Sequence, residues 1–197
     1  MTPWLDNTVI PKNTSDNNIH FIRVPLCKQE TEYTCGIACL QSILGCFGMD
    51  YRQDILAKKL QSKPIYGTDY RKIISFAQQL GFQAYFIEGM SIHKLKQFIN
   101  EGITPLLLIE AWADAGVDYT SDWSDGHYVI TCGYDTNRIY FMDPWTLGHY
   151  TYIPIDELKM RWHSIDKFGR KYYQSGLIIK KDHCKISYDP HKVKYLG

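Results

Sequence analysis

A cysteine, a histidine and an aspartate occur in the order expected for a thiol nucleophile that is followed by its base. Cys35 lies in the run Gln-Glu-Thr-Glu-Tyr-Thr-Cys-Gly, and His127 and Asp143 follow far downstream. A neutral thiol is a weak nucleophile, so an imidazole must accept its proton and a third group must orient that imidazole. The sequence therefore predicts acyl transfer with Cys35 as nucleophile, His127 as base and Asp143 as the orienting residue.

The residues after Cys35 favour its ionised form. Apolar residues recur at every fourth position, at Cys35, Cys39, Ile43 and Phe47, which predicts a helix that ends near Gly48. Cys35 would lie in the first turn of this helix. Backbone N–H groups at a helix start favour a thiolate, the form that attacks a carbonyl carbon.

An amide donor precedes the cysteine. Gln29 lies six residues before Cys35, far enough for a loop to fold back beside the sulfur. Its side-chain amide, together with the backbone N–H of Cys35, would stabilise the oxyanion of a tetrahedral intermediate. Gly36, which follows the nucleophile, is a further candidate for substrate contact.

The histidine and the aspartate are expected to meet across a hairpin. His127 begins an apolar strand at 127–134, and Asp143 ends the next strand at 138–143. A tight turn at 135–137 joins the two strands. Residues equidistant from such a turn face each other, so His127 and Asp143 should lie within one or two pair positions.

Other residues could fill the same roles. Alternative bases and acids are His149, His163, Asp122 and Asp125. His149 follows a glycine in a turn, His163 follows a helix that it could cap, and the two aspartates could shape a loop. Cys35 itself could be a small core residue, His127 a strand-end histidine bonded to a carbonyl, and Asp143 the start of a turn before Pro144.

The elements that must position these side chains differ between the two halves of the chain. Residues 21–102 predict a helical lobe with strands near 21–26 and at 82–87. Its first helix is expected near 35–47. Three further helices are expected to begin at a capping box of Asp50 and Gln53, at an N-cap of Thr68 and at Ser91. Residues 103–180 predict an antiparallel sheet, with strands at 104–111, 127–134, 138–143, 150–153 and 175–180 and a helix at 155–162. Helices that carry the cysteine and strands that carry the histidine indicate an α+β, papain-like fold. Residues 1–20 are predicted to be a polar arm and 181–197 a tail.

Composition limits the partners. The 197 residues carry a formal charge of +1 and are 45% hydrophobic, which is typical of a globular domain and gives no basis for capturing nucleic acid or anionic lipid. The chain does not begin like a secretory signal, and its longest apolar stretch is far shorter than the about 20 residues that span a bilayer. We expect a cytoplasmic protein without an integral membrane segment, acting on a peptide or protein; its oligomeric state is left open.

Six cysteines are present, namely Cys27, Cys35, Cys39, Cys46, Cys132 and Cys184. The even count would suit disulfides in a small exported protein, but without an export signal reduced thiols are expected. Cys35 and Cys39 are not followed by the compact His or Cys pair that would complete a zinc site. The predicted chemistry requires no metal and no cofactor.

Four separated elements resemble the C39 family of papain-like cysteine peptidases, the bacteriocin-processing or double-glycine peptidases. These elements are Gln29, Cys35-Gly36-x-Ala38-Cys39, Gly126-His127-Tyr128-Val129 and Asp143-Pro144. The resemblance runs over about residues 24–180. It implies peptide-bond hydrolysis, with Cys35 as nucleophile, His127 as general base and acid, Asp143 as its orienting residue and Gln29 in the oxyanion hole.

The best-known members of this family are domains of ABC exporters that remove a leader peptide after a Gly-Gly pair. This sequence shows no membrane domain and no phosphate-binding loop, so it is similar to the stand-alone members. Thr34 stands where exporter peptidases often carry an acidic residue, and 118–126 is an elaborated loop beside the histidine. Both features depart from the exporter pattern and leave the cleaved sequence open.

Aromatic residues, Trp112 among them, are frequent in the second half of the chain, and most are expected in the core or on a sheet face. Trp123 and Trp145, near the histidine, are candidates for holding a peptide, together with Gly36 and Gly126. The same thioester chemistry would also serve a transpeptidase or an amidase. A catalytically inactive peptide-binding module is the remaining alternative, and such copies usually lack the cysteine or the histidine.

Overall fold

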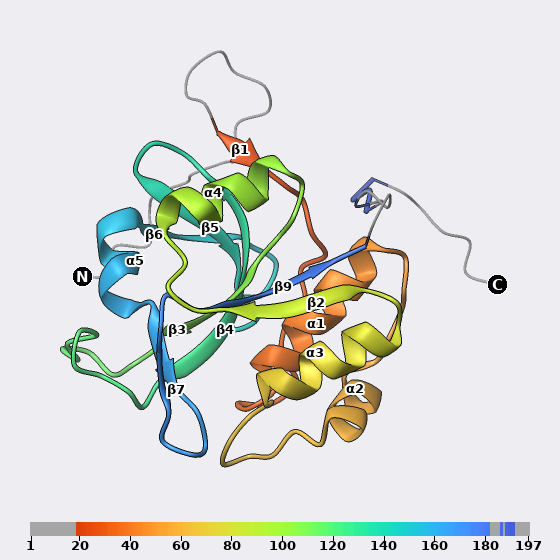
Figure 1. Cartoon of the computed structure of the whole chain (residues 1–197), viewed down its shortest axis with the longest axis horizontal. Helices are drawn as coiled ribbons and strands as arrows, with labels where there is room; N and C mark the ends of the chain where they lie inside the picture. The colour runs from red at the N-terminus through yellow and green to blue at the C-terminus, as the bar shows by residue number, and fades with distance from the viewer. Residues whose placement is uncertain (1–18, 182–185, 187, 192–197) are drawn as a thin grey trace.

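An antiparallel sheet organises the part of the chain that the computed structural model describes, residues 19–181, 186 and 188–191 (Figure 1). Its strand order is β2-β9-β3-β4-β5-β6, and β1 pairs with the end of β4. The strands are β1 His20–Phe21, β2 Gln83–Ile87, β3 Leu106–Glu110, β4 Gly126–Tyr134, β5 Arg138–Met142, β6 Thr151–Pro154 and β9 Gly176–Lys180. The predicted arm at 1–20 and tail at 181–197 lie largely outside the described residues.

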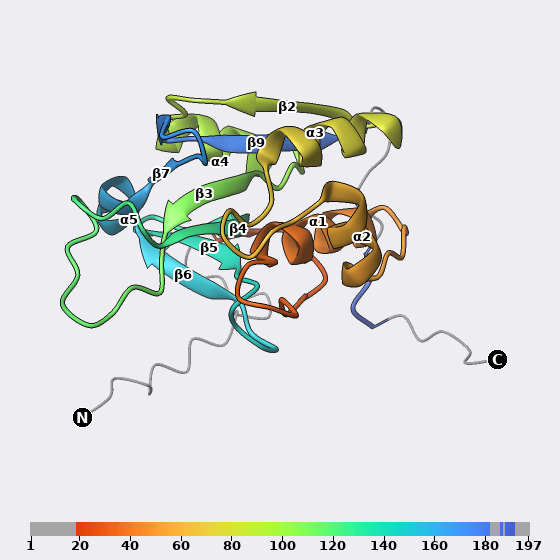
Figure 2. The ribbon, with the colours of Figure 1, turned by 90° about the horizontal axis from the view of Figure 1, so that it is seen from below.

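Helices cover both faces of the sheet (Figure 2). The helices are α1 Cys35–Cys46, α2 Gln53–Leu60, α3 Tyr70–Gln79, α4 Ile92–Asn100 and α5 Ile155–Arg161. One core cluster joins α1, α2 and α3 to one face, and a second joins α4 and α5 to the other. The central strands are therefore buried on both sides, which explains why they read as continuous apolar runs.

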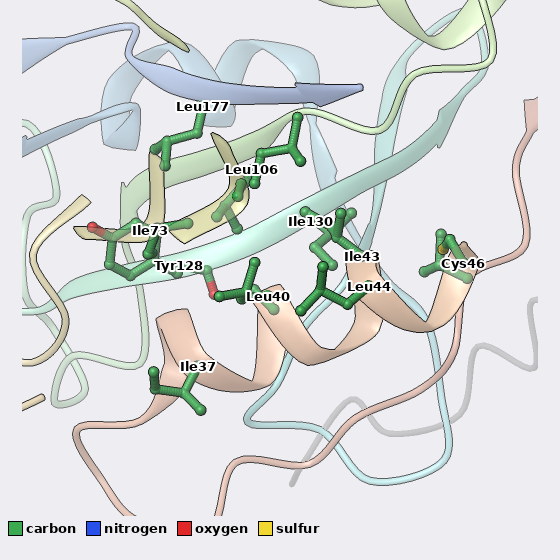
Figure 3. Close-up of a cluster of buried hydrophobic side chains, with 14 of the residues drawn as sticks. Ile37, Leu40, Ile43, Leu44, Cys46, Ile73, Leu106, Tyr128, Ile130 and Leu177 are labelled. Atoms are coloured by element: carbon green, nitrogen blue, oxygen red, sulfur yellow. The ribbon is translucent and has the colours of Figure 1, made fainter. Parts of the chain in front are cut away.

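Strand β4 shows how the two cores share one element. Tyr128, Ile130 and Cys132 belong to the core under α1, whereas Val129 points into the core under α4 and α5. Leu40 of α1 is fully buried in this core, and Figure 3 shows it beside Tyr128. Each fully buried side chain of this size contributes roughly 1.5–3 kcal/mol. This packing fixes the start of α1 against the strand that carries His127.

Of the three predicted helix N-caps, two are wrong and one is confirmed. The N-cap of α2 is Arg52, and Gln53 lies inside the helix with its side chain bonded elsewhere, so no Asp50–Gln53 capping box forms. The N-cap of α3 is Asp69, which accepts the N–H of Arg71, because the Thr68 hydroxyl is bonded to Ser62 instead. Ser91 caps α4 as predicted and accepts the N–H of Lys94 at 3.1 Å.

Most predicted strands are confirmed, with two departures. The strand expected at 21–26 is reduced to β1, although the N–H of Ile22 still donates to the carbonyl of Cys132 in β4 at 2.7 Å. A hairpin of β7 His163–Ile165 and β8 Lys171–Tyr173 was not expected. Three residues are too few for the alternation of apolar and polar side chains to indicate a strand. His163 therefore belongs to a strand and does not cap α5.

The sheet draws on both halves of the chain. Strand β2 comes from the predicted helical lobe, yet it pairs along its whole length with β9. The boundary between lobes at 102–103 stays a prediction. Across the described ranges we find no helix of the length and apolarity that crossing a membrane requires.

Candidate active site

The nucleophile candidate begins α1. Cys35 is the first residue of the helix and is 7% exposed. Gly36 allows this helix to approach β4, because a Cβ atom there would lie 3.0 Å from Cδ2 of Tyr128 and 3.2 Å from Cβ of Thr68. The close approach brings Cys35 next to the strand segment that begins with Gly126 and His127.

His127 and Asp143 are in direct contact. His127 is the second residue of β4, and Asp143 follows β5 directly. The register pairs Ile130 with Met142, so the two residues lie two pair positions apart. Nε2 of His127 lies 2.8 Å from Oδ1 of Asp143, and both side chains are almost fully buried.

This contact sets the tautomer of the imidazole. Nε2–H donates to the Asp143 carboxylate, so Nδ1 is the ring nitrogen left for the hydrogen bond with Cys35. A carboxylate bonded to one ring nitrogen fixes which nitrogen exchanges a proton with the nucleophile. The three side chains thus form an ordered series from sulfur to imidazole to carboxylate.

The charges of this series reinforce one another. Burial alone would raise the pKa of Cys35, but the hydrogen bond and positive charge of His127, with the N–H groups of Tyr128 and Gly36, lower it below its ordinary value. Burial alone would lower the pKa of His127, but the bonds to Asp143 and Cys35 and their negative charges raise it to about 9. Both shifts favour the thiolate–imidazolium pair over the neutral thiol and imidazole.

The other described cysteines behave in the opposite way. Burial raises the pKa of Cys27 to about 11 and that of Cys46 to about 12, and it raises the pKa of Cys39 and Cys132 as well. The five described cysteines are unbridged, and Cys184 lies outside the described residues. Among these five cysteines, Cys35 is the one whose pKa is lowered.

The Asp143 carboxylate accepts further hydrogen bonds besides the one from His127. Its Oδ1 also accepts the backbone N–H of Trp145 at 2.9 Å, and its Oδ2 accepts Nε1–H of Trp112 at 3.1 Å and the hydroxyl of Thr146 at 3.3 Å. These donors hold the carboxylate in one orientation.

Trp112 is a site residue that sequence reasoning missed. Most aromatic residues of this half were expected in the core or on a sheet face, yet Trp112 is 49% exposed and has a left-handed backbone with φ of 66°. Its place two residues after the end of β3, the neighbour of the strand that carries His127, was the one signal in the sequence.

Gln29 lies in the loop before the nucleophile and is 6% exposed. Its backbone N–H donates to the carbonyl of Pro144 at 2.9 Å, and its Nε2 donates to the carbonyl of Thr31 at 2.7 Å. One N–H of the side-chain amide remains for another acceptor. Its Oε1 is buried without a hydrogen-bond partner among the described residues.

The structure separates the residues predicted to hold substrate. Trp145 adjoins Asp143 and is 41% exposed, and the Lys28 ammonium lies 4.4 Å from the centre of its ring. Trp123 instead packs against the β7–β8 hairpin, with its ring centre 4.3 Å from that of His163. Gly126 is exposed and directly precedes His127. Substrate contact by these residues, and by Gly36, stays a prediction.

The alternative bases and acids have other surroundings. His163 is bonded through Nε2 to the carbonyl of Tyr119 at 2.7 Å, and His149 is exposed in the loop after Asp143. Asp122 and Asp125 lie close to Glu110 of β3. The carboxylate that meets His127 is that of Asp143.

Glu110 is a buried acid beside this site. It pairs with Gly126 across β3 and β4 and is fully buried, and its Oε2 accepts the N–H of Asp125 at 2.8 Å. Burial raises its pKa to about 8; the Asp125 N–H opposes that shift, and the charges of Asp122 and Asp125 add to it. The described residues include no trio of His, Cys, Asp or Glu side chains arranged for a metal ion.

Comparisons with known proteins identify the family and the fold of the chain. The model of the peptidase C39-like family matches residues 21–169. No relative was found among the curated proteins.

Three solved structures share the fold. A double-glycine motif protease from an AMS/PCAT transporter, crystallised with the leader peptide, is 21% identical, with 82% of this chain and 94% of that one covered and a TM-score of 0.57. The peptidase domain of Streptococcus ComA, a bifunctional ABC transporter, is 18% identical, with 80% and 98% covered and a TM-score of 0.57. A protein of Bacillus anthracis described as a C39-like peptidase is 17% identical, with 82% and 98% covered and a TM-score of 0.62. The chain belongs to the peptidase C39-like family.

Proposed function

We propose that this chain is a cysteine peptidase in which Cys35 is the nucleophile, His127 the general base and acid, Asp143 the orienting carboxylate and Gln29 an oxyanion donor. The observation that carries the proposal is the buried 2.8 Å contact between Nε2 of His127 and Oδ1 of Asp143, which leaves Nδ1 for the thiol at the start of α1. A purely structural role for His127 would not explain why its other ring nitrogen is hydrogen-bonded to a cysteine whose pKa is lowered.

The residues define a sequence of steps. The Cys35 thiolate attacks the carbonyl carbon of the scissile bond, and the carbonyl oxygen gains the negative charge. The free N–H of the Gln29 amide and the backbone N–H of Cys35 stabilise that oxyanion. His127 donates its Nδ1 proton to the leaving amine, and a water molecule, deprotonated by His127, then hydrolyses the thioester. The released acid leaves Cys35 and His127 as the initial ion pair.

The substrate we propose is a peptide segment such as the leader of a larger polypeptide. Support comes from the family and from the transporter protease that was crystallised with its leader peptide. The residue before the nucleophile, Thr34, is buried and its hydroxyl bonds the carbonyl of Thr31 at 3.1 Å, so it serves the turn rather than presenting a charge to substrate. For this reason the proposal does not extend to a Gly-Gly requirement.

A peptide-library digest analysed by mass spectrometry tests the proposal, with wild type and Cys35→Ala compared side by side. Cleavage that requires Cys35 is the expected result, and cleavage that persists in Cys35→Ala contradicts it. Products that carry an amine adduct in place of a free acid would reassign the protein as a transpeptidase or amidase. If iodoacetamide labels Cys35 no faster than Cys132 at neutral pH, the chain is a binding module instead.

A further inference from the structure

A buried glutamine from α2 holds the loop that carries Gln29. Gln53 is the first residue of α2 and is 6% exposed. Its Nε2 donates to the carbonyl of Lys28 at 2.7 Å, and its Oε1 accepts the N–H of Glu30 at 3.2 Å. Lys28 and Glu30 are the neighbours of Gln29 on either side. The Gln53 amide is therefore hydrogen-bonded to the backbone on both sides of the proposed oxyanion donor.

The orientation of the Gln53 amide is fixed by a further bond. Its Nε2 also donates to Oε1 of Gln41 in α1 at 3.0 Å, and Nε2 of Gln41 in turn donates to the carbonyl of Tyr51 at 2.7 Å. A reversed amide would place oxygen against the Lys28 carbonyl and N–H against the Glu30 N–H. Because both polar atoms are buried and bonded, removing them leaves unsatisfied partners in the loop.

Few other contacts hold the backbone on either side of Gln29. Apart from Gln53, the short segment 28–30 is held by the Gln29 N–H bond to Pro144 and by the contact of Lys28 with Trp145. A displacement of about 1 Å in a catalytic group can cost on the order of 100-fold in rate.

We propose that Gln53 is a positioning residue that holds Gln29 in place to stabilise the oxyanion, an inference that rests on the proposed function. Gln53 touches neither the sulfur nor the imidazole in any contact among the described residues, so it acts through Gln29. It should therefore matter for reactions that form a tetrahedral oxyanion and not for those that use the thiolate alone.

Two reagents separate these cases without knowledge of the natural substrate. Acylation of Cys35 by p-nitrophenyl acetate passes through a tetrahedral oxyanion, whereas alkylation by iodoacetamide does not. We expect Gln53→Met, which keeps the size of the side chain, to lower the acylation rate by roughly 10- to 100-fold and to leave alkylation within about twofold. Gln53→Glu should act likewise, because its carboxylate would face the carbonyl of Lys28.

A double-mutant cycle isolates the path through Gln29. In a Gln29→Ala background, Gln53→Met should change acylation by less than about twofold, since the donor that it positions is gone. Gln78→Met is the matched control, because the Gln78 amide also donates to a backbone carbonyl, that of Ala84 at 2.8 Å, but at the end of α3. It should leave both reactions unchanged.

The outcomes distinguish the two proposals. Acylation at the wild-type rate in both Gln53 variants, while Gln29→Ala is slow, would overturn the positioning role alone. An equal loss of acylation and alkylation would also overturn it, because Gln53 would then support the fold in general. A further 10- to 100-fold loss of acylation rate from Gln53→Met in the Gln29→Ala background would overturn it as well. If wild type is acylated no faster than Cys35→Ala, the proposed function itself fails.

Discussion

The backbone N–H of Gln29 donates to the carbonyl of Pro144 at 2.9 Å, which joins the loop before the nucleophile to the residue after the acid. A second link lies beside it, since the Lys28 ammonium bonds the carbonyl of Trp145 and lies over its ring. The proposed oxyanion donor and the proposed orienting acid, far apart in sequence, thus belong to one connected segment pair. A change that displaces either segment is expected to disturb both functions.

The pKa shifts predict different alkaline behaviour for turnover and for thiol reactivity. The pKa of His127 is raised to about 9, so the imidazolium that protonates the leaving amine is lost as the pH rises through that value. Peptide turnover should fall there. The Cys35 thiolate persists, so alkylation by iodoacetamide should not fall. On the acid side, both rates should decline only below the ordinary pKa of a thiol, because the pKa of Cys35 is lowered.

Rate profiles of both reactions between pH 4 and 10.5 test this prediction. The two limbs report the Cys35–His127 pair as a unit and not one residue each. Turnover that stays level through pH 10 would contradict the role of His127 as the acid.

Removing the charge of Asp143 should weaken the ion pair. In Asp143→Asn the pKa of His127 loses the support of the carboxylate, so less thiolate forms at neutral pH. Oδ2 also accepts from Trp112, and an amide cannot accept at both of its atoms. We expect turnover at pH 7 to fall by about 100-fold, with alkylation at pH 7 reduced as well. Asp156→Asn, at an exposed position in α5, is the control, and an equal effect there would point to a general loss of stability.

The sequence predicted where Cys35, His127 and Asp143 lie better than it predicted the residues that hold them there. Cys35 could be placed at a helix start because apolar spacing is local, and His127 could be placed opposite Asp143 because a short hairpin fixes its register. Gln53 was misassigned to a capping box, since its contacts with Lys28 and Glu30 depend on how α2 packs against the loop. No local pattern carries that information.

Trp112 shows the same limit from another side. A tryptophan next to a strand reads as a core residue, and its left-handed backbone and its bond to Asp143 arise only once the sheet has formed. The β7–β8 hairpin was missed because its strands are too short for their alternation to count. Long-range contacts therefore account for what the sequence did not predict.

Trp112→Phe should cost activity while preserving most of the ring contact. The variant keeps an aromatic side chain but loses the N–H that donates to Oδ2 of Asp143 at 3.1 Å. We expect a loss of about 0.5–1.5 kcal/mol in the free energy of unfolding and a fall in kcat of about 10-fold with little change in KM. Urea denaturation and steady-state kinetics measure the two effects.

A second substitution at this position separates the bond from the backbone strain. Trp112→Gly also lacks the bond but relieves the left-handed backbone, a conformation that costs a non-glycine residue about 1–3 kcal/mol. The relief of strain should therefore offset part of the stability that Trp112→Gly loses with the side chain. Its kcat should equal that of Trp112→Phe. Wild-type kcat in Trp112→Phe would show that the indole N–H has no part in holding Asp143.

Gly36→Ala should separate the nucleophile from its base. The new methyl group would lie 3.0 Å from Cδ2 of Tyr128, so the start of α1 must move away from β4. Overpacking of this kind costs about 1–3 kcal/mol, and the displacement should slow alkylation of Cys35 at pH 7. Leu40→Ala, deeper in the same helix, is the control, because it removes core volume without pushing Cys35 away from His127. If Gly36→Ala alkylates no more slowly than Leu40→Ala, the close approach of α1 does not determine the ion pair.

Glu110→Gln should stabilise the protein at pH 8 and not at pH 5. The carboxyl group of Glu110 has its pKa raised to about 8 in the folded state, so between its unfolded pKa and that value the folded state holds a proton that the unfolded state has released. Wild-type stability is therefore full at low pH and declines as the pH rises towards 8. A neutral glutamine can still accept the N–H of Asp125 through its oxygen. Urea denaturation at both pH values should show Glu110→Gln more stable by on the order of 1–3 kcal/mol at pH 8 and equal within error at pH 5; the same difference at both pH values would show that the buried charge is not the cause.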